Sequence, residues 1–92
     1  MSEPGEPSAE ELLEAVRSMK VADLLLSTAA TLAQLGFAKL DESTRDLAEA
    51  RLAIEATRSL LKTLEGAVPE ETLRDFQQVI ANLQLAYAKA AR

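Results

Sequence analysis

Mainly apolar residues recur along this chain at steps of three and four, which is the spacing of one face of an α-helix. In residues 44–65 they are Leu47, Ala50, Ile54, Thr57, Leu61 and Leu64. In residues 69–91 they are Leu73, Phe76, Ile80, Leu83, Tyr87 and Ala90. Gly66 suits the end of the first segment and Pro69 the start of the second. The short link between them predicts an antiparallel helical hairpin with matching seams.

Residues 9–35 form a third segment, which is apolar on nearly every side of a helix. After Asp23 no charged residue occurs until Lys39. One face carries Leu25, Thr28, Leu32 and Leu35, and the rest is largely covered by Leu24, Leu26, Ala29, Ala30 and Ala33. A helix with so few polar sides must be buried on more than one side. We therefore expect other helices, or a second copy of the chain, to surround it.

The ends of this segment carry helix signals of their own. Ser8 and Glu11 have the spacing of a capping box, which marks a helix start. The apolar stripe changes its phase near Lys20, which predicts either a bend or a split into helices 9–19 and 21–35. Gly36 is well placed to end the helix.

Together these patterns predict an all-α fold. We expect a three-helix domain over residues 8–92, whose long first helix, bent or broken near Lys20, packs on the antiparallel hairpin. The expected helices cover about 9–35, 44–65 and 69–91. Residues 1–7 are acidic and proline-rich, and we predict that they form a disordered lead-in.

Composition removes several classes of function. The chain contains no cysteine and no histidine, and its formal net charge is −5. Zinc, iron–sulfur and haem sites ordinarily depend on those two residue types, so we expect no cofactor and no metal. An acidic chain without a basic cluster repels phosphate backbones, so we expect no nucleic-acid partner.

The N-terminal region lacks the positive charge and apolar run of a secretory signal. The apolar stretch at residues 24–35 is shorter than the roughly 20 residues that span a bilayer. We therefore expect a soluble, cytoplasmic protein that does not bind membranes.

Candidate catalytic residues are few and lack their usual context. Ser59 and Lys62 match the S-x-x-K string of Ser/Lys acyl enzymes, but the accompanying motifs are missing. Acidic residues gather in predicted first turns, where they favour the helix dipole. Asp23 fits a helix cap or a surface ion pair, and Tyr87 fits a core seam. The sequence therefore predicts a protein that is not an enzyme.

Small and uncharged residues favour an interaction surface. The run at residues 27–31 allows close approach of another helix, and the polar positions of residues 77–84 are uncharged. We predict self-association, most simply as a dimer. A contact with a different protein is a second possibility. The candidate surface consists of Leu25, Thr28, Ala29, Leu32, Gln78, Asn82 and Leu85.

Several strings resemble a known family. They are Asp46-Leu-Ala-Glu-Ala-Arg-Leu-Ala-Ile54, Leu60-Leu61, Leu73-Arg-Asp75 and Leu83-Gln-Leu-Ala-Tyr87. They resemble a bacterial family known as domain of unknown function 1844, especially its actinobacterial branch, over roughly residues 20–91. The resemblance implies no activity, cofactor or catalytic residue. It implies a gene neighbourhood near translation initiation and ribosomal proteins.

Three functions follow as hypotheses. The leading one is a non-enzymatic helical module that self-associates and acts as an adaptor. The second is a regulatory partner of a translation-related or other basic assembly, contacted through acidic helix faces. The third is an enzyme or ligand carrier whose site lies between protomers.

Overall fold

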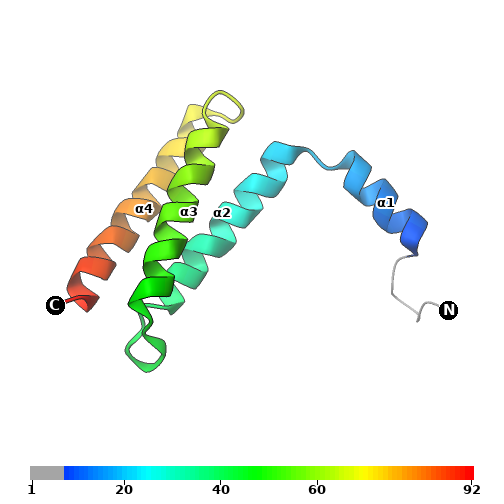
Figure 1. Cartoon of the computed structure of the whole chain (residues 1–92). Coiled ribbons are helices and arrows are strands. Elements are labelled where there is room, and N and C mark those ends of the chain that lie inside the picture. Colours follow the sequence, from blue (N-terminus) through cyan, green and yellow to red (C-terminus); the bar gives the residue numbers. More distant parts are fainter. Residues whose placement is uncertain (1–7) are drawn as a thin grey trace.

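The computed structural model describes residues 8–92 and contains helices connected by short links (Figure 1). The α-helices are α1 (Ala9–Ser18), α2 (Val21–Ala38), α3 (Leu47–Leu64) and α4 (Glu70–Ala90), with a short 3-10 helix, η1 (Glu42–Thr44), before α3. Residues 8–92 contain no strand, so the predicted all-α class is confirmed. The predicted disordered lead-in, residues 1–7, lies outside the described residues.

The first predicted helix, residues 9–35, is two helices. Of the bend and the split that the sequence left open, the structure shows the split. Met19 and Lys20 both have extended backbones, with ψ angles of 139° and 136°, and therefore interrupt the helical ladder. The phase change of the apolar stripe marks this position.

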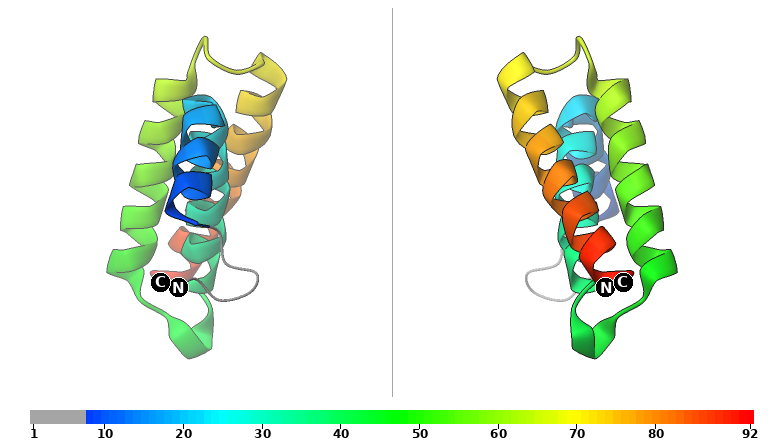
Figure 2. Two further views of the ribbon diagram at one scale, coloured as in Figure 1. Left: turned by 90° about the vertical axis from the view of Figure 1, so that its right-hand side faces the viewer. Right: turned by 90° about the vertical axis from the view of Figure 1, so that its left-hand side faces the viewer.

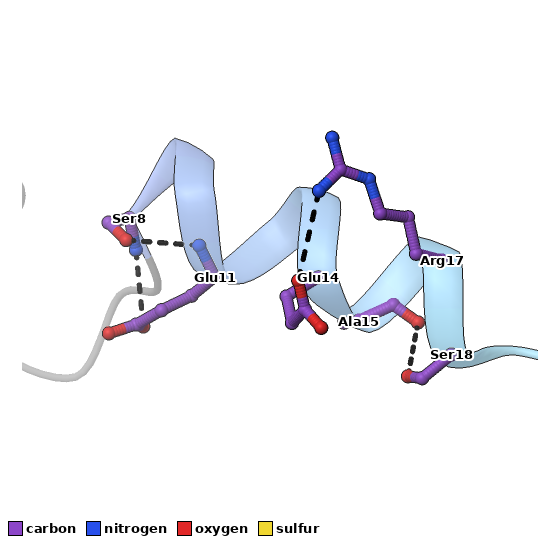
Figure 3. Close-up of polar contacts among 6 residues, drawn as sticks. All are labelled: Ser8, Glu11, Glu14, Ala15, Arg17 and Ser18. Carbon is purple, nitrogen blue, oxygen red and sulfur yellow. Dashed lines mark hydrogen bonds and ion pairs between the residues drawn. The ribbon is translucent and has the colours of Figure 1, made fainter.

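Helix α1 has the predicted capping box (Figure 3). The Ser8 hydroxyl accepts the Glu11 N–H at 3.1 Å, and the Glu11 carboxylate accepts the Ser8 N–H at 3.3 Å. A 3.8 Å ion pair joins Glu14 to Arg17, and the Ser18 hydroxyl donates to the Ala15 carbonyl oxygen. These contacts all lie within α1, so they stabilise the helix without attaching it to anything else.

The prediction that Gly36 ends its helix is wrong, because α2 continues to Ala38. Gly36 is buried, and a Cβ atom at this position would lie 3.1 Å from Leu83 Cδ2 and 3.4 Å from Ala53 Cβ. The missing side chain therefore allows α2 to approach α3 and α4 closely. A glycine pattern alone does not distinguish this packing role from a helix end.

The helix predicted from residue 44 begins three residues later, because Asp46 is its N-cap. The Asp46 carboxylate accepts the Glu49 N–H at 3.1 Å. Thr44 instead ends η1, and its hydroxyl donates to the Ala38 carbonyl oxygen at 2.6 Å. Arg45 donates to the Leu40 carbonyl oxygen at 3.1 Å. These bonds satisfy carbonyl oxygens at and just after the end of α2. They use residues that were expected to start the next helix.

Helices α2, α3 and α4 pack together and are called the bundle from here on. Side views, turned by 90° from Figure 1, place α2 over the junction between α3 and α4 (Figure 2). One cluster of the core joins Ala33 and Leu40 to Ile54 and Leu83, and a second contains Leu61, Leu64, Leu73 and Ile80. The predicted seams of α3 and α4 thus supply most of the core.

Helix α1 lies outside the bundle. None of its ten residues is buried, and it runs away from the N-terminal end of α2 (Figure 1). In place of one long helix on a hairpin, α2 alone packs on α3 and α4, and α1 forms a separate arm.

Candidate interaction surface

The most unusual surface feature is the apolar face of α1. Leu12, Leu13, Val16 and Met19 are each about half exposed. Leu12, Leu13 and Val16 lie along one side of the helix, and Met19, the C-cap residue, follows three residues later. The acids Glu10, Glu11 and Glu14 lie towards other sides. We call the four apolar residues the α1 stripe.

A second apolar area lies on the bundle. It contains Val21, Leu24 and Leu35, with Thr28 between them, on α2, and Leu52 and Leu60 on α3. Val21 and Leu52 are the most exposed of these, at 73% and 61%. We call these six residues the α2–α3 face.

The grooves on either side of α4 show where this face lies. Ala30, Gln34 and Phe37 line the groove of α2 towards α4. Arg58 and Lys62 line the groove of α3 towards α4. At 100° per residue, the α2 residues of this face and Leu60 lie on flanks opposite these grooves. Leu52 lies on the outward side of α3, close in helical phase to Ser59, which also lines the α3–α4 groove. Since α2 packs mainly on α3, the α2 residues of the face and Leu60 lie on the side of this helix pair that is turned away from α4.

Helix direction sets the order of residues along this face. Helices α2 and α3 run antiparallel (Figure 1). Leu24 therefore lies at the same end of the face as Leu60, and Leu35 at the same end as Leu52. Glu49 is the acid on this flank of α3 and lies near the Leu52 end. The face is thus an apolar strip with one charge at its margin.

The structure does not bring the seven predicted surface residues together. Ala29 is completely buried, and Leu25 is half-buried against the Leu61 cluster. Leu32 is also half-buried. Thr28 is exposed, but its hydroxyl donates to the Leu24 carbonyl oxygen at 2.8 Å.

The other three predicted residues lie on the outward side of α4. Gln78 and Asn82 are exposed and hydrogen-bonded to each other at 3.2 Å. Leu85 is 63% exposed. Helical phase places them opposite buried Ile80, away from α2 and α3. The predicted surface is therefore two separate areas, one on α2 and one on α4.

Sequence reasoning did not select the α1 stripe or Leu52. The sequence predicts that the whole first helix packs on the hairpin, which would have covered this side of residues 9–19. Leu52 is a large apolar residue outside the α3 seam.

The candidate catalytic residues do not form a site. Ser59 and Lys62 are exposed and line an open groove of about 750 Å³ between α3 and α4. Tyr87 is half-buried and packs on the core cluster that contains Leu83. Asp23 is exposed on the first turn of α2. Within residues 8–92, no three acidic side chains are grouped closely enough to hold a metal ion.

Helix α2 is long and apolar enough, by length and composition alone, to cross a membrane. A core helix of a soluble protein meets the same criteria, so this single helix is weak evidence. Its residues Ala29, Ala33 and Gly36 are buried within the bundle. Only 17% of its 18 residues are buried, so packing within the bundle accounts for a small part of its apolar character.

Comparison of the chain with protein-family models, curated proteins and solved structures finds no match. The resemblance to domain of unknown function 1844 therefore stays a prediction.

Proposed function

We propose that this protein is a non-enzymatic, cytoplasmic helical module that self-associates, most simply as a dimer, and acts as an adaptor. The observation that supports this proposal is the amount of apolar side chain left uncovered. The α1 stripe and the α2–α3 face together expose eight large apolar residues by about half or more, namely Leu12, Leu13, Val16, Met19, Val21, Leu24, Leu35 and Leu52.

The size of this surface favours a protein contact. Eight half-exposed side chains of this size supply on the order of 800 Å², which is what one partner contributes to a standard interface. Covering this surface contributes a favourable free energy of ~25 cal/mol per Å² of apolar area buried. The costs of association are subtracted from that gain.

Molecular mass measured over a range of protein concentrations tests the proposal. The wild-type chain should have twice the monomer mass, and Leu35→Glu should shift it to the monomer. Leu85→Glu is the control, because Leu85 is also exposed, at 63% against 47% for Leu35, but lies on α4 outside the α2–α3 face. A monomeric wild-type chain at every concentration would overturn the proposal. Dissociation by Leu85→Glu alone would assign self-association to the outer face of α4.

A second function is supported by the acidic side of α1. Glu10, Glu11 and Glu14 are all exposed there, and the whole chain carries a net charge of −5. Such a surface suits a regulatory contact with a basic protein assembly. That contact should weaken steeply with added salt, whereas an apolar dimer interface should not. Affinity purification at low and at high salt separates the two functions.

A further inference from the structure

The α1 arm is too short to be stable by itself. Isolated helices below about 12–15 residues are marginal in water, and α1 has ten residues. Its capping box and its exposed Glu14–Arg17 pair add little to the stability of the isolated helix. A persistent α1 therefore needs a surface that covers its stripe.

The chain directs α1 away from its own bundle. Met19 and Lys20 are both extended and form the whole connection between α1 and α2. In this conformation α1 diverges from α2 at the link and projects outward from the end of α2 (Figure 1). Short connections of this kind favour exchange of an element between identical chains.

The α2–α3 face matches α1 in length and chemistry. Ten helical residues extend about 15 Å, and the twelve residues of the Leu24–Leu35 segment extend about 18 Å. The stripe is apolar, and so is most of the face. When the stripe is covered, Glu10, Glu11 and Glu14 remain on the sides of α1 that face solvent. No charge on α1 then has to be buried.

We propose that α1 of each chain packs on the α2–α3 face of a second copy, so that the dimer exchanges two identical arms. This inference rests on the proposed self-association and specifies its contact. The exchange is closed by a two-fold axis, since each copy supplies one arm and one face. The two contacts together cover the apolar surface of both chains, which is the area that a stable dimer needs.

Mixing two defective variants tests the exchange. Val16→Asp disables the arm and Leu35→Asp disables the face. Each variant alone loses both contacts of its dimer and should dimerise ~100-fold more weakly or worse, because an unpaired charge is buried. An equal mixture should form a heterodimer, because the intact arm of one chain meets the intact face of the other. Leu85→Asp is the control and should dimerise normally.

The outcomes distinguish this inference from the proposed function. If the wild-type chain is a dimer but the mixture stays monomeric, arm exchange is wrong and self-association stands. The same holds if Val16→Asp alone dimerises normally. If the wild-type chain is a monomer, both proposals are wrong. Circular dichroism of each variant establishes that the bundle remains folded.

Thiol cross-linking provides a second measurement, because the native chain has no cysteine. A chain with both Val16→Cys and Thr28→Cys is treated with a short bifunctional thiol reagent. Exchange predicts covalent dimers on a denaturing gel. A cross-link confined to single chains would show that α1 folds back on its own α2 and would overturn the exchange.

Discussion

The α1 arm and the bundle are both amphipathic helical structure, yet they use their apolar residues differently. In the bundle, Leu64 and Leu83 are almost completely buried, and so is Thr57, whose hydroxyl donates to the Ala53 carbonyl oxygen at 2.7 Å. In the arm, Leu12 and Leu13 have the same chemistry and remain half exposed. The difference teaches that periodicity establishes a helical face but does not establish what covers it.

The largest effect should follow from removing core volume. Leu83→Ala should lower the free energy of unfolding by about 2–5 kcal/mol, because Leu83 is fully buried against Ala33 and Ile54. Leu12→Ala should change it by less than ~0.5 kcal/mol when the chain is monomeric. Urea denaturation at low protein concentration measures both. Equal losses would mean that α1 belongs to the bundle's cooperative unit.

A smaller loss should follow from crowding the closest helix contact. Gly36→Val should destabilise the bundle by about 1–3 kcal/mol, because its side chain would meet Leu83 and Ala53. Gly36→Ala is the control, in which the ~0.5–1 kcal/mol gain of alanine over glycine in a helix offsets a 3.1 Å contact. Thermal unfolding compares them. A neutral valine variant would contradict the close approach of α2.

Helix caps provide a comparison of arm and bundle with matched chemistry. Asp46→Ala removes the N-cap of α3 and should lower the free energy of unfolding by about 1 kcal/mol. Ser8→Ala removes the N-cap of α1 and should reduce only the helicity of the arm. Hydrogen exchange resolves the two regions. A global loss from Ser8→Ala would show that the arm supports the bundle within one chain.

The smallest effect should be a pH dependence in the link before α3. The backbone N–H of Ser43, then its hydroxyl, and the Arg45 charge hold the pKa of Asp41 below its ordinary value of 3.8. Since the folded pKa is the lower one, Asp41 stabilises the fold above pH 3.8, and this is lost as pH falls through the folded pKa.

Asp41→Asn should therefore make the decline of stability in acid shallower, with Ser43→Ala intermediate, because it leaves the backbone donor in place. Denaturation midpoints measured between neutral and acid pH give the slope. An unchanged slope for Asp41→Asn would contradict this role of the carboxylate.

Much of the fold could be predicted from local signals. The seams of α3 and α4, the capping box at Ser8 and the interruption near Lys20 are all present in the sequence, because caps and periodicity act over a few residues. The errors arose where distant segments compete. Gly36 has the pattern of a helix end, but contact with Leu83 keeps it inside α2. Thr44 suits a helix start, but its hydroxyl instead donates a hydrogen bond to the Ala38 carbonyl oxygen.

The candidate surface was less predictable than the fold. Ala29 and Leu85 both looked suited to contact with another chain. Packing buries the first completely and leaves the second exposed on the far side of α4. Which flank of a helix stays free depends on where two other helices lie, and that information is not local.

The sequence by itself determined that this chain is helical, where its hairpin turns and which residues form the seams. Each of those properties follows from spacing, caps and backbone preference within a few residues. Only the tertiary structure decided that α1 stands apart from the bundle and that large apolar residues of α2 and α3 remain exposed. Those outcomes depend on how three helices share a limited core, since α3 and α4 cover one side of α2 and leave the rest to solvent.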